Sequence, residues 1–121
     1  MNTLISGSYV HTNQHHLGQA VLNKERARQL WNQASRYIQR GAYRRAIIRF
    51  ERLRQLPGMT EVDKNKMLYN IGTANLRLRR FATAIFYFET YLKGPGINEQ
   101  QKIDAEKWMQ KAMQGAGIRL Q

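Results

Sequence analysis

The chain has 121 residues, which suffices for one small domain and excludes a multidomain enzyme. Its hydrophobic fraction of 42% includes two Trp, six Tyr and four Phe, so a packed core can form, whereas the lack of Cys excludes disulfide frameworks and zinc fingers. Twenty Lys and Arg against eight Asp and Glu give a formal charge of +12, which predicts attraction to an acidic protein face, a nucleic acid or an anionic membrane.

Residues 1–22 are polar and show little sustained periodicity, which predicts a flexible arm with at most a short helix over residues 17–22. Neither the cationic segment nor the apolar run of a secretory signal peptide is present there, so we expect a cytoplasmic protein. No stretch approaches the roughly 18 consecutive apolar residues of a membrane span. Any membrane contact would therefore be peripheral.

Helical periodicity begins after Asn23, a residue suited to capping a helix N-terminus, and continues to Gly41. A second helix is expected from Tyr43 to the residues before Pro57, because proline donates no backbone N–H. The same kinds of signal predict three further helices, over residues 60–78, 81–92 and 98–114, and no run predicts a strand.

The two helical pairs repeat one another at a spacing of 38 residues. A helical pair repeated with such a period predicts a solenoid, in which neighbouring pairs bury each other's apolar faces. The shift superposes identical or chemically similar residues, namely Leu30 and Leu68, Trp31 and Tyr69, Asn32 and Asn70, Ala34 and Gly72, Tyr43 and Phe81, Ala46 and Ala84, Ile47 and Ile85, Phe50 and Phe88, Glu51 and Glu89, and Pro57 and Pro95.

These positions resemble the signature of the tetratricopeptide repeat family, in which a large residue, a small residue, aromatics and a proline follow at fixed spacings. The resemblance implies an all-α fold, a right-handed α-α superhelix of two helix pairs plus a C-terminal helix. The signature residues are Leu30, Ala34, Tyr37, Gly41, Tyr43, Ala46, Phe50 and Pro57 in the first pair, and Leu68, Gly72, Phe81, Ala84, Phe88 and Pro95 in the second.

The resemblance also divides the chain. It implies a repeat domain over residues 23–114, with repeats at about 27–58 and 65–96, and a short tail at 115–121. The fifth helix, 98–114, is interpreted as a capping helix in which Trp108 and Ala112 hold the first two signature positions. Two departures stand out: the period exceeds the family's 34 residues, and Arg79 replaces Gly41 at the turn of the second pair.

Members of this family bind extended peptides or helices in a concave groove lined by the first helix of each pair. By this resemblance the groove combines two aromatic anchors, two asparagines able to bond a peptide backbone, and three cations. The carboxylate clamp of chaperone-tail binders is matched only at Asn70, so we do not expect binding of a chaperone's acidic C-terminal motif. The predicted groove residues are Arg28, Trp31, Asn32, Ser35, Lys66, Tyr69, Asn70, Thr73 and Arg77.

Enzyme chemistry finds no support in the sequence. The chain has no thiol, and its three histidines all lie in the predicted arm, where no packed core would hold them against a Ser or a carboxylate. His11 and His15 have the spacing of a metal-binding pair only if the arm is helical, and a solvated tail is the preferred interpretation. We therefore expect no catalytic site, no metal and no cofactor.

The charge is concentrated in the first repeat, where residues 24–54 hold ten Lys and Arg against two Glu, a net of +8. Four arginines of the second helix fall opposite Ala46 and Phe50, which predicts that they are exposed on the convex side. This basic face is either a solvated surface or a docking surface for an acidic partner. Its residues are Arg44, Arg45, Arg49 and Arg52.

The first hypothesis is a non-enzymatic adaptor, or an assembly or secretion-type chaperone, that binds an acidic or amphipathic segment of a partner within a larger complex. The alternative is a nucleic-acid or ribonucleoprotein-binding module, because a charge of +12 would displace many counterions from phosphates. The aromatics available for base stacking occupy repeat core positions, which weakens that alternative. A third hypothesis is a homo-oligomer formed through Trp108 and Met113 of the fifth helix.

Overall fold

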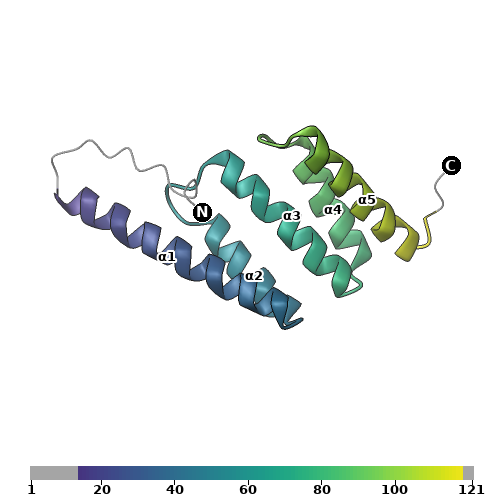
Figure 1. Cartoon of the computed structure of the whole chain (residues 1–121), viewed down its shortest axis with the longest axis horizontal. Helices are drawn as coiled ribbons and strands as arrows, with labels where there is room; N and C mark the ends of the chain where they lie inside the picture. Colours follow the sequence, from purple (N-terminus) through teal and green to yellow (C-terminus); the bar gives the residue numbers. More distant parts are fainter. Residues whose placement is uncertain (1–13, 119–121) are drawn as a thin grey trace.

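The computed structural model describes the backbone of residues 14–118 and the side chains of residues 23–118. Within this part of the chain the fold is all-α, as the periodicity predicted, and no strand is present. Consecutive helices pack against each other, so that α1, α3 and α5 form one layer and α2 and α4 lie behind them (Figure 1). The helices are α1 (Gln14–Gln39), α2 (Tyr43–Arg54), α3 (Glu61–Arg77), α4 (Phe81–Lys93) and α5 (Glu99–Gly115).

Helix α1 starts earlier than the sequence predicted. It begins at Gln14, nine residues before the expected cap at Asn23, so the segment 14–22 assigned to a flexible arm is helical. No proline and a single glycine occur between these two positions, and nothing else there breaks a helix. The N-terminal turns of α1 consequently project beyond the end of α2 (Figure 1). Residues 1–13 of the predicted arm lie outside the described residues.

The turns inside the two helix pairs have the same hydrogen-bonding pattern. At the end of α1, Ala42 N donates to Tyr37 O at 2.8 Å, and Gly41 has a φ of 76°. At the end of α3, Arg80 N donates to Asn75 O at 2.9 Å, and Arg79 has a φ of 61°. Arg79 therefore adopts the left-handed conformation that glycine provides in the first pair.

Two apolar cores lie side by side along the array. The small residues expected at the helix crossings are buried, and a Cβ added to Gly72 would come within 2.9 Å of the Phe88 ring. That approach explains why α3 and α4 need the smallest residue at this crossing. The first core consists of Ala27, Leu30, Ala34, Ala46, Phe50, Leu53, Met59, Met67 and Ile71, and the second of Leu68, Ala84, Phe88, Tyr91, Ala105 and Ala112.

A buried asparagine joins α3 to the segment after α4. Asn65 Nδ2 donates to the backbone carbonyls of Tyr91 and Pro95, each at 3.1 Å. The Tyr91 carbonyl belongs to the last turn of α4 and also accepts from Gly94 N at 3.0 Å, whereas Pro95 follows the helix. Gly94 lets the two segments meet, because a Cβ on it would lie 2.2 Å from the Asn65 side chain.

Helix α5 begins with the capping box that the sequence predicted. Asn98 Oδ1 accepts from Gln101 N, and Gln101 Oε1 accepts from Asn98 N, both at 2.8 Å. At the start of α3, Thr60 caps the helix, since its Oγ1 accepts from Asp63 N at 3.1 Å. Both helices therefore start where the sequence indicated.

Burial fixes the register of α5 against α3. Applying the 38-residue shift once more places Ala105 and Ala112 on Met67 and Ala74, and all four residues are buried. The same shift places Glu106 and Gln110, both exposed, on the buried Leu68 and Gly72. Leu68 and Gly72 face α4, and no helix covers the corresponding face of α5 in the described chain. The assignment of Trp108 and Ala112 to the first two signature positions is thus displaced by two residues.

Candidate functional site

Three hollows meet at the side chain of Tyr69, on the layer formed by α1, α3 and α5. Their volumes are about 370, 270 and 390 Å³. Tyr69 lines all three, so together they form one depression, named here the Tyr69 groove. It is lined by Ile38, Tyr43, Lys66, Tyr69, Asn70, Thr73, Ala74, Arg77, Tyr91, Gln101, Asp104, Lys107, Trp108 and Lys111.

Aromatic rings support the centre of the groove. The ring of Tyr69 lies 6.1 Å from that of Phe88 and 5.3 Å from that of Tyr91, both of which belong to the second core. The Tyr69 hydroxyl also shares a hydrogen bond with the Trp108 side chain of α5. Two aromatic side chains from neighbouring helices are thereby held together at the groove surface, each with a polar atom available to orient a ligand.

Burial raises the pKa of Tyr69 above its usual value of 10.0. The hydrogen bond with Trp108 acts against burial and lowers the pKa of Tyr69. The nearby carboxylate of Asp104 acts with burial and raises the pKa. The pKa of Tyr91 is also raised, first by burial and then by Tyr69 and Asp104. Both phenols therefore stay protonated near neutral pH, and neither adds negative charge to the groove.

The groove is predominantly cationic. Four cationic side chains line it against one carboxylate, that of Asp104. Lys111 Nζ lies 5.1 Å from the centroid of the Trp108 ring, and Lys66 Nζ lies 3.8 Å from Asp63 Oδ1. The surface thus places apolar rings beside positive charge, which suits a ligand that has both apolar and acidic groups. The cations are Lys66, Arg77, Lys107 and Lys111.

The predicted groove residues of α3 line the Tyr69 groove, whereas those of α1 do not. Every α3 residue of the predicted groove lines the Tyr69 groove, namely Lys66, Tyr69, Asn70, Thr73 and Arg77. Of the α1 residues, Arg28 is exposed and pairs with Glu25, and Asn32 is exposed while Ser35 is half-buried. None of these three lines the hollows described above, and α1 contributes Ile38 instead.

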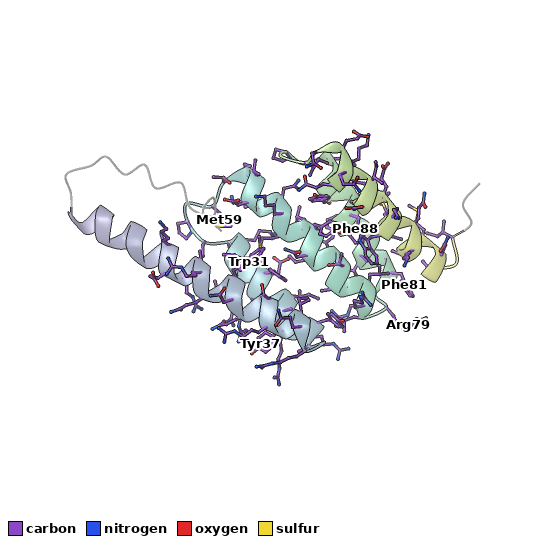
Figure 2. The ribbon with its side chains drawn as sticks, viewed as in Figure 1. Trp31, Tyr37, Met59, Arg79, Phe81 and Phe88 are labelled. Carbon is purple, nitrogen blue, oxygen red and sulfur yellow. The ribbon has the colours of Figure 1, made fainter. Side chains whose placement is uncertain are left out.

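Trp31 serves the first core. Its ring meets that of Phe50 edge-on, with centroids 5.9 Å apart, and packs on the residues between α1 and α2 (Figure 2). Trp31 does not line the three hollows. A substitution at Trp31 would therefore disturb the packing of the first pair, and it is unsuited to testing binding alone.

Sequence reasoning missed the contribution of α5 to the groove. The 38-residue shift maps α3 residues of the groove onto α5 residues that also line it. The signal was therefore present, but the two-residue displacement in aligning α5 concealed it. In this register Lys66, Tyr69, Asn70 and Thr73 correspond to Asp104, Lys107, Trp108 and Lys111.

Three of the four arginines of the predicted basic face are exposed, and the fourth is half-buried. Arg44, Arg45 and Arg52 are exposed, as expected. Arg49 is half-buried instead, because its Nε donates to Gln33 Oε1 at 2.9 Å and its guanidinium lies 5.5 Å from the Tyr37 ring centroid. Arg49 thus attaches α2 to α1, and Arg45 approaches the same ring at 6.0 Å.

The two residues on which the homo-oligomer hypothesis rests, Trp108 and Met113, are not the most exposed residues of α5. Trp108 is directed to Tyr69 inside the chain, and Met113 is half-buried. The outward face of α5 presents the exposed polar residues Glu106 and Gln110 and one exposed apolar residue, Ile103. A homo-oligomer through α5 therefore stays a prediction, and Ile103 is the exposed apolar residue that it could bury.

His11 lies outside the described residues, and the structure does not describe the side chains of His15 and His16. Among the residues whose side chains the structure describes, no cluster of three potential metal ligands occurs. In the same part of the chain no helix is both long and apolar enough to cross a bilayer. Comparison with protein-family models, curated proteins and solved structures gives no match to this chain.

Proposed function

We propose that the chain is a non-enzymatic interaction module of the tetratricopeptide type, which holds an acidic or amphipathic segment of a partner protein in the Tyr69 groove. The observation that carries the proposal is that four cations line one open depression together with Tyr69 and Trp108. Such a surface attracts carboxylates and offers aromatic anchors to an apolar side chain.

The shape of the groove favours an extended segment over a small ligand. The hollows are open and follow α3 and α5, and no pair of titratable groups in them has the spacing and perturbed pKa of an acid–base site. Asn70 and Gln101 line the same depression with side-chain amides, which can both donate to and accept from a peptide backbone. An adaptor and an assembly chaperone would use such a groove in the same way.

The test uses fluorescent acidic amphipathic peptides, screened as a set and then measured by anisotropy with the tightest binder. The double variant Lys107→Glu/Lys111→Glu should weaken binding by about tenfold or more, because it reverses two charges beside Trp108. The matched control, Lys24→Glu/Lys102→Glu, makes the same change of net charge at exposed positions that do not line the groove. It should weaken binding far less.

Equal weakening by both double variants would contradict the groove as the binding surface. The nucleic-acid alternative is tested in the same assay with labelled single-stranded oligonucleotides of unrelated sequence. Tight, sequence-indifferent binding with a steep salt dependence, together with no peptide binding, would replace the present proposal with that alternative.

A further inference from the structure

Two large apolar side chains are exposed at equivalent positions on the layer opposite the groove. Ile48 of α2 is 47% exposed and Phe86 of α4 is 62% exposed, and the two are separated by the repeat period of 38 residues. Phe86 has the larger exposed fraction of the two, and neither lines any of the hollows described above. Both therefore project from the helices with much of their surface uncovered by the residues that the structure describes.

The surroundings of these two residues differ sharply. One turn from Ile48 on α2 are Arg44, Arg45 and Arg52, all exposed. At the corresponding positions of α4 are Ala82, Thr83 and Thr90, which are uncharged and exposed. The ion pairs that the described residues form use other cations, Arg28, Arg54, Lys64 and Lys66, so Arg44, Arg45 and Arg52 have no carboxylate partner among them.

Contacts at the edge of this surface hold α2 and α4 in a fixed relation. Tyr87 Oη donates to Glu51 Oε1 at 3.1 Å, and the same carboxylate group binds Arg54 through Oε2 at 3.2 Å. The ring of Phe86 contacts that of Tyr87, with centroids 5.5 Å apart. Ile48 and Glu51 lie one turn apart on α2, so the cationic half and the apolar half belong to one surface. This surface, comprising Arg44, Arg45, Ile48, Arg52, Thr83, Phe86 and Thr90, is named here the outer face.

The chemistry of the outer face limits what can cover it. A second copy of the chain would bring a further +12 charge against the three arginines, which opposes self-association. A nucleic acid would use the arginines but would gain nothing from Ile48. A partner helix normally docks into a groove, whereas Ile48 and Phe86 stand on helix surfaces outside the described hollows.

We propose that the outer face binds an anionic phospholipid surface, with Arg44, Arg45 and Arg52 on the headgroup phosphates and with Phe86 and Ile48 inserted among the acyl chains near the headgroups. A bilayer interface accepts basic and apolar side chains together and needs no recess in the protein. Glu89, exposed on α4, is the acidic residue that opposes this contact. The inference is independent of the groove, which lies on the opposite layer.

Cosedimentation with unilamellar vesicles tests the proposal. The intact chain should bind vesicles of phosphatidylcholine containing about 30% phosphatidylserine, and should not bind pure phosphatidylcholine, since each basic residue near an anionic surface adds to the attraction. Phe86→Ser and Arg44→Gln/Arg52→Gln should each lower the partition coefficient by about tenfold. The controls, Ile103→Ser and Lys24→Gln/Lys102→Gln, remove an apolar residue that is 44% exposed on α5 and the same charge elsewhere, and should have much smaller effects.

A site-specific label distinguishes insertion from loose electrostatic attraction. The chain has no cysteine, so Thr83→Cys can be labelled with a polarity-sensitive dye beside Phe86, with Gln110→Cys on α5 as its control. Anionic vesicles should shift the emission of the first label to shorter wavelength and leave the second unchanged. The proposal fails if neither label responds, if the control variants lose as much binding as the outer-face variants, or if an acidic amphipathic peptide shifts the Thr83 label and vesicles do not. The last result would assign the outer face to a protein partner, and each result is independent of peptide binding in the Tyr69 groove.

Discussion

Arg79 shows how one residue can depart from a repeat pattern without changing the turn. Its φ of 61° lies in the left-handed region, which costs a residue with a Cβ about 1–2 kcal/mol. Part of that cost is offset because its guanidinium lies 5.2 Å from the centroid of the Phe81 ring, at the turn between α3 and α4 (Figure 2). The turn therefore keeps its left-handed backbone conformation although arginine disfavours it.

We expect Arg79→Gly to be more stable than Arg79→Ala by about 1 kcal/mol, because both lose the ring contact and only alanine keeps the strained backbone. Gly41→Ala should lose a similar amount, since a Cβ there has nothing within 4 Å and the cost is purely conformational. Urea unfolding followed by circular dichroism measures all three variants. Equal stabilities of the two Arg79 variants would show that the turn relaxes around alanine.

At the scale of the helices, sequence patterns predicted most of the elements and missed interactions between distant segments. Caps, glycines and prolines placed the ends of α2 to α5, because these signals act within a few residues. The start of α1 was misplaced, since Asn23 can lie inside a helix as well as cap one. Asn65 escaped notice because its partners, the carbonyls of Tyr91 and Pro95, lie 26 and 30 residues away. A buried polar residue of this kind has no local signature.

Asn65→Ala should lower the free energy of unfolding by about 1–3 kcal/mol, because it leaves the Pro95 carbonyl without its buried donor and removes one of the two donors to the Tyr91 carbonyl. Asn70→Ala, five residues later on α3 and half-buried in the groove, is the control and should change stability by less than about 0.5 kcal/mol. Thermal and urea unfolding measure both. A small loss at Asn65 would mean that water replaces its amide at those carbonyls.

At the scale of the molecule, tyrosines link its stability to alkaline pH. Burial is the main cause that raises the pKa values of Tyr69, Tyr87 and Tyr91 above 10.0, and the carboxylate of Glu51 adds to it at Tyr87. Between pH 10 and these raised values the unfolded chain loses phenolic protons that the folded chain retains, so ionisation favours unfolding. The contribution of these tyrosines is complete below pH 10 and is lost as the pH rises through the folded-state values.

The urea midpoint should therefore fall as the pH is raised above about 10, in step with the near-ultraviolet absorbance of phenolate. Tyr87→Phe should reduce the steepness of that fall, because it removes one of the three groups, although it also loses the hydrogen bond to Glu51. A midpoint that stays constant while the phenolate absorbance rises would contradict the linkage. The measurement needs no partner and can be made on the intact chain.

The repeat also separates the two tryptophans of the chain. Trp31 contacts Phe50 in the first core, whereas Trp108 adjoins Tyr69 and Lys111 in the groove. Each indole therefore lies in a different half of the molecule and has different neighbours that can quench its fluorescence. Replacing either tryptophan by phenylalanine leaves one tryptophan whose emission reports on one half. The two variants can then show by fluorescence which half unfolds first and which half a ligand contacts.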